Sequence, residues 1–331
     1  MIEHVLDLGN QLKKELEISN EFVVDSYKDL LIVGMGGSGV AGDVLKLVMN
    51  ETTSINVEVR KAYGIPKVTA ERKPKCLFIS YSGNTEETVE AVNDAIQYNL
   101  DWSVISSGGK LLDLALKHKK PYIKVPSGLQ PRAAFGLMTK AVMHFVSSDE
   151  SGKYLELCNQ AGDYINEVIE NQSHNKLLEH AFKIAKEIDT KSSVIYGGTP
   201  LTYLVAQRWK TQINENAKSK AFVGYMPEIH HNEILSWEAN KKDSKNNYQL
   251  LFLRSSNENP QVNKRFELTK EIIGDKVNIS EIDNISSANI ISNLFHLTLI
   301  GDLVSVYMAE NLNIDPYNIN AIEQLKKLLK G

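Results

Sequence analysis

The sequence predicts an α/β protein of two lobes, each a mostly parallel sheet between layers of helices in a three-layer α/β/α arrangement. Apolar runs typical of buried parallel strands alternate with segments of helical periodicity along nearly the whole chain. A unit of strand, Gly-Gly and helix occurs twice, at residues 31–39 and 194–199. The length of 331 residues agrees with two domains, which we place at residues 1–150 and 151–331.

The first lobe begins with a helical pattern over residues 1–20 and continues as alternating strands and helices. The apolar face of that first helix comprises Val5, Leu8, Leu12 and Leu16. The apolar run 30–33 ends in glycines, as expected for a buried parallel strand that leads into a helix. Further strands are expected at 56–60, 76–80, 102–106 and 122–125. Helices are expected at 40–49, 85–98, 111–117 and 135–145.

The second lobe has the same alternation. A long helical region at 154–187 leads to a strand at 193–196, and a helix follows at 200–216 with Pro200 in its first turn. Later strands are expected at 249–253 and 276–279, and a final helix at 288–311. The segment 240–247, rich in lysine and asparagine, is expected to be a surface loop.

Composition excludes several classes of protein. Hydrophobic residues make up 42% and charged residues 24%, with a net charge of −4, so nucleic-acid binding through phosphate contacts is not expected. Two cysteines, Cys76 and Cys158, are too few for a disulfide framework and fit small core positions in a reducing cytoplasm. The apolar stretch 290–308 is interrupted by polar residues, so a buried helix is expected there and no membrane partner. The first residues lack the apolar region of a signal peptide.

A glycine-rich motif follows the first apolar strand. Gly34-Met35-Gly36-Gly37-Ser38-Gly39 satisfies the pattern G-x-G-x-x-G, and Glu58 lies about where a ribose-binding acid is found in dinucleotide folds. An NAD(P)-dependent oxidoreductase is therefore one interpretation. The same glycines and helix N-terminus suit any phosphate, and a tight turn without a ligand is a further alternative.

A second polar loop favours a phosphomonoester over a dinucleotide. Residues 80–87, Ser-Tyr-Ser-Gly-Asn-Thr-Glu-Glu, also follow an apolar strand and open a helix. Their hydroxyl and amide groups form a compact set of donors. A dinucleotide fold has no need of this second loop, whereas one phosphate together with sugar hydroxyls would use both loops.

The motifs together resemble a known family. SYSGNTEET preceded by GMGGSG is similar to the sugar isomerase (SIS) domain. With the motifs PRAAF at 131–135, NENA at 214–217 and HNE at 231–233, the chain resembles the archaeal-type bifunctional phosphoglucose/phosphomannose isomerases, which have two SIS domains. The resemblance implies that glucose 6-phosphate and mannose 6-phosphate are interconverted with fructose 6-phosphate through a cis-enediol. It also implies that no cofactor or metal takes part and that the cytoplasmic enzyme is a homodimer with shared active sites.

The resemblance also implies a role for individual residues. The sugar phosphate would be held by Gly36, Gly37, Ser38, Ser80, Ser82 and Thr85. Arg132 would stabilise the enediolate near C1 and C2, and Glu215 would be the base that moves the proton between these carbons. His231, from a second subunit, would help to open the sugar ring. Lys326 would complete the site, although Lys327 is adjacent, just as His230 is adjacent to His231.

Other interpretations are open for the same residues. On sequence grounds alone, Glu215 and Lys326 could be solvated helix residues, and Arg132 could be an exposed residue before a helix. His230, His231 and Glu233 lack the spacing of a zinc motif. A SIS-type sensor that binds a sugar phosphate without turnover is the non-catalytic alternative. In the second lobe, residues 254–257 match the SYSGNT loop poorly, which predicts one phosphate site per chain.

Overall fold

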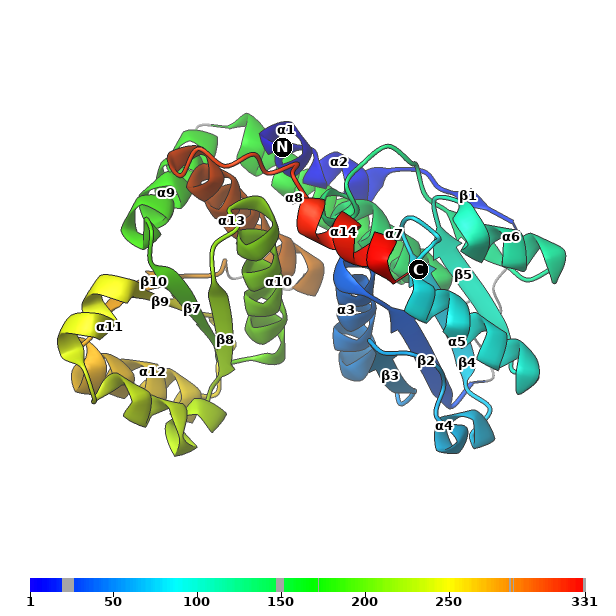
Figure 1. Cartoon of the computed structure of the whole chain (residues 1–331), viewed down its shortest axis with the longest axis horizontal. Helices are drawn as coiled ribbons and strands as arrows, with labels where there is room; N and C mark the ends of the chain where they lie inside the picture. Colours follow the sequence, from blue (N-terminus) through cyan, green and yellow to red (C-terminus); the bar gives the residue numbers. More distant parts are fainter. Residues whose placement is uncertain (20–26, 147–151, 172, 286, 288, 330–331) are drawn as a thin grey trace. The chain divides into compact units, whose positions relative to one another are not determined.

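The structure is a computed structural model that describes residues 1–19, 27–146, 152–171, 173–285, 287 and 289–329 (Figure 1). Its contacts divide the chain into two units, which we treat separately. The N-terminal lobe comprises Asp7–Glu167 and Ala288–Ser292. The C-terminal lobe comprises Met1–Leu6, Val168–Ser287 and Asn293–Gly331. The domain boundary between residues 150 and 151 stays a prediction.

A six-stranded sheet forms the centre of the N-terminal lobe. Its strands are β1 (Glu17–Ile18), β2 (Asp29–Gly34), β3 (Asn56–Arg60), β4 (Lys75–Ser80), β5 (Trp102–Ser106) and β6 (Tyr122–Lys124), in the order β1-β6-β5-β4-β2-β3. All neighbours are parallel except β1 and β6. Strand β2 lies between β3 and β4, so the strand order reverses there. In open parallel sheets, ligands bind at the carboxyl ends of the strands at such a switch point.

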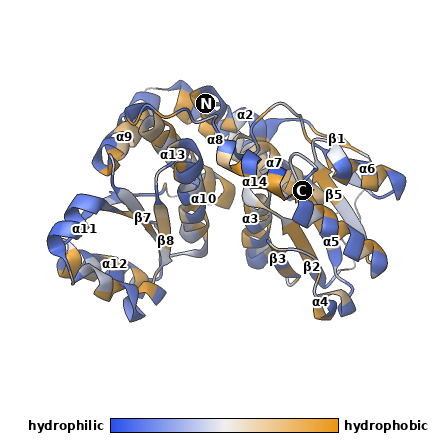
Figure 2. Cartoon of the chain, viewed as in Figure 1, coloured by the Kyte–Doolittle hydropathy of each residue, from blue (hydrophilic) through white to orange (hydrophobic). Residues whose placement is uncertain are grey.

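Helices cover both faces of this sheet. Helices α3 (Gly36–Thr52) and α7 (Phe135–Val146) pack together over one face, and α5 (Glu86–Gln97) and α6 (Gly109–Lys117) pack together over the other. Alternate strand residues point to opposite faces. Leu31 and Phe78 belong to the cluster under α5 and α6, whereas Ile32 faces Gly42 of α3. The predicted three-layer arrangement is confirmed, and Figure 2 shows β2 as strongly hydrophobic.

The C-terminal lobe has four parallel strands between two helical layers. The strands are β7 (Ser192–Gly197), β8 (Ala221–Tyr225), β9 (Tyr248–Leu253) and β10 (Asn278–Ile282), in the order β10-β9-β7-β8. Helix α10 (Pro200–Asn216) packs over β7 and β8. A core cluster that includes Tyr196, Phe252 and Trp237 lies on the sheet face covered by the 3₁₀-helices η2 (Glu228–His231) and η3 (Glu233–Trp237) and by α12 (Pro260–Ile273).

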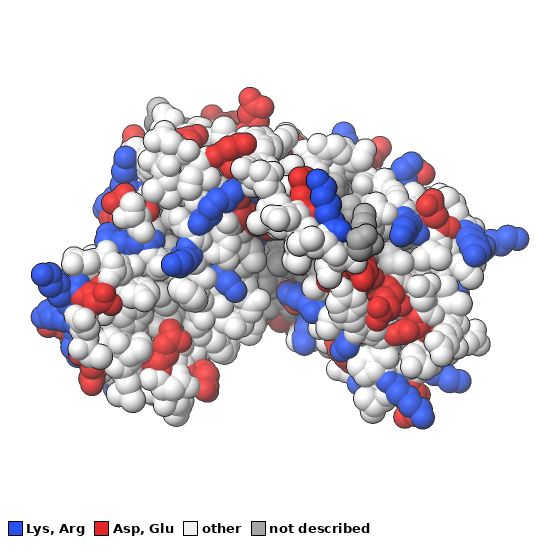
Figure 3. Space-filling model, viewed as in Figure 1, with Lys and Arg blue, Asp and Glu red and all other residues white. Residues whose placement is uncertain are grey.

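The remaining elements that the structure describes are helices. They are α1 (Ile2–Leu6), α2 (Leu8–Lys13), α4 (Lys67–Glu71), η1 (Pro131–Ala133), α8 (Lys153–Glu170), α9 (Ser173–Ile188), α11 (Lys241–Asn247), α13 (Ile290–Asn311) and α14 (Asn320–Leu328). Helix α13 is the one helix of the described chain long and apolar enough to span a membrane, and 83% of its most apolar window is buried. A buried helix was predicted here. On the face seen in Figure 3, acidic and basic side chains are interspersed.

Several predicted elements are corrected by the structure. The helix expected over residues 1–20 breaks at Asp7 and ends at Lys13, because residues 17–18 form the edge strand β1, which pairs with β6. The long helical region expected at 154–187 contains two helices, α8 and α9. The loop expected at 240–247 contains helix α11, which Asn240 caps by accepting a hydrogen bond from the Asp243 N–H at 3.2 Å. Strand β8 was not predicted, and the strand expected at 276–279 is β10, at Asn278–Ile282.

Candidate active site

The glycine-rich loop after β2 leads directly into α3. Met35 is the extended N-cap residue and Gly36 has a φ of +51°, which favours glycine. The helix begins at Gly36, earlier than predicted, so the motif forms the first turn of the helix, where backbone N–H groups lack helical partners. A Cβ at Gly37 would stand 3.2 Å from the carbonyl oxygen of Pro131. This loop therefore lies against the segment that carries Arg132.

The loop after β4 is held in shape by its own hydroxyl groups. Ser80 Oγ lies 2.8 Å from Thr85 Oγ1 and accepts a hydrogen bond from the Gly83 N–H at 3.1 Å. Ser82 Oγ accepts from the Asn84 N–H at 3.3 Å. Gly83 has a φ of +68°, and a Cβ there would stand 1.7 Å from the carbonyl oxygen of Gly108, so another residue would clash. Ser80 is buried, Thr85 is half-buried and Ser82 is exposed.

The two loops are joined by a hydrogen bond across the switch point. Ser38 Oγ accepts from the Tyr81 N–H at 3.1 Å, although 43 residues separate the two in sequence. A third loop, after β5, supports the second, because Ser107 donates to the Tyr81 carbonyl through its N–H at 3.0 Å and its hydroxyl at 2.6 Å. Sequence reasoning missed Ser107, although the run Ser-Ser-Gly-Gly after a strand was a signal.

Arg132 is buried, with 5% of its surface exposed. It lies in η1, before α7, which corrects the alternative of an exposed residue ahead of a helix. Its neighbour Ala133 is fixed by Gln11, whose Nε2 donates to the Ala133 carbonyl at 3.0 Å and whose Oε1 accepts from the Gly136 N–H at 3.1 Å. Gln11 is a supporting residue that no sequence motif indicated.

The N-terminal lobe therefore brings together the residues predicted to hold a phosphate. Gly36, Gly37, Ser38, Ser80, Ser82 and Thr85 all belong to two loops at the switch point, joined by the hydrogen bond between Ser38 and Tyr81. Glu58 is not placed for a ribose. It is the third of five residues of β3 and pairs with Arg72 at 2.5 Å, away from the carboxyl end of the strand. These observations favour a small phosphorylated ligand over a dinucleotide.

Glu215 lies in the last turn of α10, in the C-terminal lobe. It lines a cavity of about 470 Å³ together with Asn214, Lys218 and residues 318–322, at the start of α14. Lys218 Nζ donates to the carbonyl oxygens of Glu215 at 2.6 Å and of Asp315 at 3.1 Å. Lys218 therefore ties the end of α10 to the segment that leads into α14.

The end of α10 is also anchored to α13. Arg208 and Asp302, both 2% exposed, form an ion pair at 2.6 Å, and Asn216 Nδ2 donates to Ser305 Oγ at 2.9 Å. Buried charges need paired and well-directed partners. The backbone that carries Glu215 is therefore fixed within this lobe on both sides, by α13 and by Lys218.

The two adjacent histidines have different environments. His230 is half-buried; its Nδ1 lies 3.0 Å from Arg265 Nη1 and its Nε2 lies 2.8 Å from Thr269 Oγ1. Because the guanidinium only donates, Nδ1 accepts and Nε2 carries the proton. Burial and the nearby charge of Arg265 lower the pKa of His230. His231 is exposed, and no hydrogen bond holds its ring to the described residues.

Lys326 and Lys327 lie on the exposed helix α14. Ile322, one turn before Lys326, lines the cavity that contains Glu215. Residues four apart share a helix face, whereas Lys327 lies about 140° around the helix from Ile322. The helical register therefore favours Lys326 as the lysine on the cavity side.

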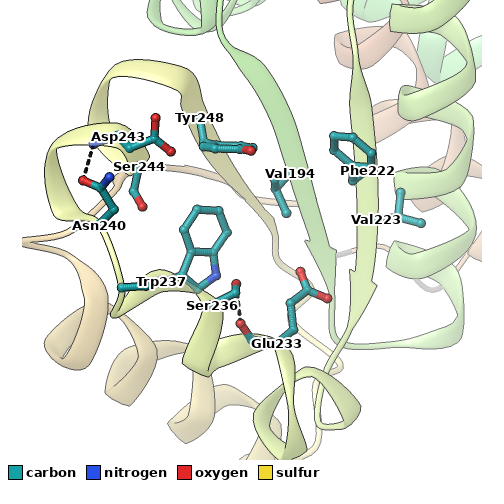
Figure 4. Close-up of a pocket in the computed structure, with 11 residues that line it drawn as sticks. Val194, Phe222, Val223, Glu233, Ser236, Trp237, Asn240, Asp243, Ser244 and Tyr248 are labelled. Carbon is teal, nitrogen blue, oxygen red and sulfur yellow. Dashed lines mark hydrogen bonds between the residues drawn. The ribbon is translucent and has the colours of Figure 1, made fainter.

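A second cavity of the C-terminal lobe, of about 570 Å³, lies beside the edge strand β8 (Figure 4). Trp237, Tyr248 and Phe222 are among its aromatic lining residues, and Glu233 and Asp243 are its carboxylates. None of its lining residues is Lys or Arg, so it is poorly suited to a phosphate. Glu233, of the predicted HNE motif, accepts a hydrogen bond from the Tyr196 hydroxyl at 2.6 Å and supports the core.

Comparisons with known proteins agree with this architecture. Residues 25–106 match the SIS domain model, and residues 178–329 match the model described as bacterial phospho-glucose isomerase C-terminal SIS domain. A hypothetical protein of Thermus thermophilus shares the fold, with a TM-score of 0.73 at 12% identity over 99% of this chain and 86% of that chain. The protein is therefore of the two-SIS-domain class.

Curated relatives identify the family within this class. A bifunctional phosphoglucose/phosphomannose isomerase of Thermoplasma acidophilum is 32% identical over 98% of both chains, and one of Aquifex aeolicus is 32% identical over 92% of this chain and 91% of that one. The chain belongs to the bifunctional phosphoglucose/phosphomannose isomerase family. A D-glucosamine-6-phosphate 4-epimerase of Sulfolobus acidocaldarius is 28% identical over 92% of this chain and 90% of that one.

Proposed function

We propose that this chain is an aldose–ketose isomerase that interconverts glucose 6-phosphate and mannose 6-phosphate with fructose 6-phosphate. Membership of the family supports the reaction class. The observation that carries the proposal is the pair of hydroxyl-rich loops at the switch point of the N-terminal lobe, joined by Ser38 and Tyr81. A single phosphate, free to accept hydrogen bonds from both loops, suits this arrangement better than the pyrophosphate of a dinucleotide.

The chemistry requires one proton to move between neighbouring carbons. In the open-chain aldose, we assign Glu215 as the base that removes the proton from C2 and returns it to C1 of the cis-enediol. Arg132 supplies a fixed positive charge for the oxygens that become negative in the enediolate. Glucose 6-phosphate and mannose 6-phosphate differ only at C2 and give the same enediol, so one base serves both aldoses.

His231 and Lys326 complete the proposed site. His231 is the imidazole proposed to assist ring opening, because it is exposed while His230 is held by Arg265 and Thr269. In the family that the chain resembles, this histidine comes from a second subunit, so we propose a homodimer that shares its active sites. Lys326 is proposed as the lysine of the site from its position on the face of α14 that Ile322 also occupies. The compartment proposed is the cytoplasm.

The direct test is a coupled assay with four substrates. Purified protein is incubated with glucose 6-phosphate, mannose 6-phosphate, fructose 6-phosphate or glucosamine 6-phosphate, with and without prior treatment with EDTA. We expect isomerisation of the first three, with no loss after EDTA treatment. Activity on glucosamine 6-phosphate alone would replace the proposal by epimerisation, and loss of activity that Zn²⁺ restores would assign a metal to the histidine cluster.

A further inference from the structure

The C-terminal lobe has a loop after β9 at the place that corresponds to the loop after β4. Strand β9 corresponds to β4 by its place in the sheet. In the N-terminal lobe, β4 lies next to β2 on the side away from β3; in the C-terminal lobe, β9 lies next to β7 on the side away from β8. Residues 80–85 and 253–258, counted from the last residue of each strand, align without a gap. Ser82 and Asn84 then correspond to Ser255 and Asn257, and Thr85 corresponds to Glu258.

The two loops have the same local turn. In the N-terminal lobe, the Asn84 N–H donates to Ser82 Oγ at 3.3 Å. In the C-terminal lobe, the Asn257 N–H donates to Ser255 Oγ, also at 3.3 Å. The two loops therefore share this hydrogen bond and its residue types. They differ at Gly83, whose φ of +68° has no counterpart at Ser256, at Ser80, which corresponds to Leu253, and at Thr85, which corresponds to Glu258.

The Glu258 carboxylate folds back onto its own loop. Its side chain is 3% exposed. Its Oε1 accepts from the Ser255 N–H at 2.8 Å, and its Oε2 accepts from Arg254 Nη2 at 3.1 Å and Nε at 3.2 Å. The corresponding Ser82 N–H has no hydrogen-bond partner among the residues that the structure describes. In the C-terminal lobe, the Glu258 carboxylate thus occupies the position that is open to an external anion in the N-terminal lobe.

In the glycine loop of the C-terminal lobe, backbone N–H groups are also bound by a side chain of the same chain. Thr202 Oγ1 accepts from the Gly198 N–H at 3.0 Å and from the Thr199 N–H at 2.9 Å. The backbone donors that would face a phosphate on this side are therefore engaged by the first turn of α10. In the second lobe, the N–H groups of Gly198, Thr199, Ser255 and Asn257 thus have partners within the chain.

We infer that residues 254–258 form an oxyanion loop whose ligand position is occupied by the chain's own Glu258. This inference rests on the proposed phosphate role of the first-lobe loops. It gives a physical reason for one sugar phosphate per chain, and it assigns a latent site for a small oxyanion such as inorganic phosphate. Glu258 is the residue that keeps this site closed.

The guanidinium of the latent site does not depend on Glu258 for its position. Arg254 Nη1 also contacts Glu281 at 2.6 Å and Glu267 at 3.0 Å, and its guanidinium stacks on the Phe266 ring at 4.4 Å. Replacement of Glu258 by a smaller neutral residue would therefore release Arg254 Nε and the Ser255 N–H without releasing the side chain that carries them. A small oxyanion then finds preorganised donors.

The test counts phosphate sites in matched variants. Glu258→Thr, which copies Thr85, is compared with wild type by isothermal titration with inorganic phosphate at constant ionic strength. We expect one additional phosphate per chain. Glu258→Gln keeps the position filled, and Glu267→Gln removes a charge beside Arg254 without opening the loop, so neither should gain a site. Arg254→Gln added to Glu258→Thr should remove the new site.

Thermal unfolding provides the second measurement. We expect Glu258→Thr to lose stability and to regain it in phosphate but not in sodium chloride of equal ionic strength. A Glu258→Thr protein with wild-type phosphate stoichiometry and no phosphate-dependent gain in Tm would overturn the inference. Both comparisons are repeated with Ser80→Ala and Thr85→Ala in the first lobe. If these substitutions leave wild-type phosphate binding unchanged, the proposed function loses its phosphate site, while the Glu258 comparison still decides this inference.

Discussion

At the scale of single residues, the proposal depends most on Glu215. Glu215→Gln keeps the shape and hydrogen bonding of the side chain but removes the base, so kcat should fall by ~10²-fold or more while KM changes little. The measurement is steady-state kinetics with both aldose phosphates. Glu271→Gln, at an exposed carboxylate of α12, is the matched control and should behave as wild type. Near-normal kcat in Glu215→Gln would assign the base to another residue.

The two histidines should respond differently to substitution. His231→Ala should lower kcat/KM by ~10-fold or more, because the exposed imidazole is the one proposed to act in ring opening. His230→Ala should leave kcat/KM nearly unchanged but lower the free energy of unfolding by about 1–2 kcal/mol, since it removes contacts with Arg265 and Thr269. Kinetics and urea unfolding of both variants decide this, and the reverse pattern would make His230 the active residue.

His296 should make stability depend on pH. Burial, and to a smaller extent the nearby His180, lower the pKa of His296 to about 4, compared with roughly 6.5 in an unfolded chain. The folded state thus favours the neutral imidazole. This contribution to stability is complete above about pH 6.5 and declines as the pH falls toward 4. Between pH 8 and pH 5 the loss should be about 2 kcal/mol, measured by urea unfolding as a difference from His296→Gln. If the stability of wild type and of His296→Gln depended equally on pH, the prediction for His296 would be wrong.

Residue types and their spacing indicated the two hydroxyl-rich loops that the structure brings together, but not the residues that support them. Ser38, Ser80, Ser82 and Thr85 stand in motifs whose donors have an evident chemical use, so the sequence alone indicates them. Arg132 is buried between Pro131, which Gly37 approaches closely, and Ala133, whose carbonyl oxygen accepts a hydrogen bond from Gln11; Gly37 and Gln11 are both distant in sequence. Long-range contacts of this kind leave no local pattern. The residue-by-residue roles in catalysis stay predictions that the variants above would decide.

At the scale of elements, strands buried on both faces were predicted well, whereas of the edge strands β3 has its predicted bounds and β8 was missed. β5 and α10 have the predicted bounds, since continuous apolar runs and a proline in the first turn are strong local signals. Strand β8 escaped prediction because it is a short edge strand with an exposed Phe222 and a glycine, Gly224, where a Cβ would stand 2.6 Å from the Tyr196 ring. Tertiary packing, which local propensity does not encode, placed it in the sheet.

The register of helix α14 distinguishes the proposed role of Lys326 from that of Lys327. Lys326 follows Ile322 by four residues, and Ile322 lines the cavity of Glu215, whereas Lys327 points to another side of the helix. Lys326→Met should therefore reduce kcat by ~10-fold or more, and Lys327→Met should stay within about twofold of wild type. Circular dichroism of both variants checks that α14 is retained. A larger loss in Lys327→Met would shift the assignment by one residue.

At the scale of the whole molecule, the proposed homodimer is tested by complementation. His231 lies on η2 with its ring unbound by the described residues, as expected of a side chain that acts on another subunit. In a two-fold dimer the exchange is reciprocal, so each subunit lends its histidine to the other. Glu215→Gln and His231→Ala chains with different affinity tags are co-expressed, and the heterodimer is purified through both tags.

If the histidine acts in trans, one site of this heterodimer has both defects and the other has neither. The purified heterodimer should then show about half of the wild-type activity, although each homodimer is nearly inactive. If the histidine acts within its own chain, every site keeps one defect and no activity returns. Because both chains are confirmed in the sample by their tags, an inactive heterodimer would refute the shared site. The phosphate loops and the isomerase assignment rest on other observations and would stand in either case.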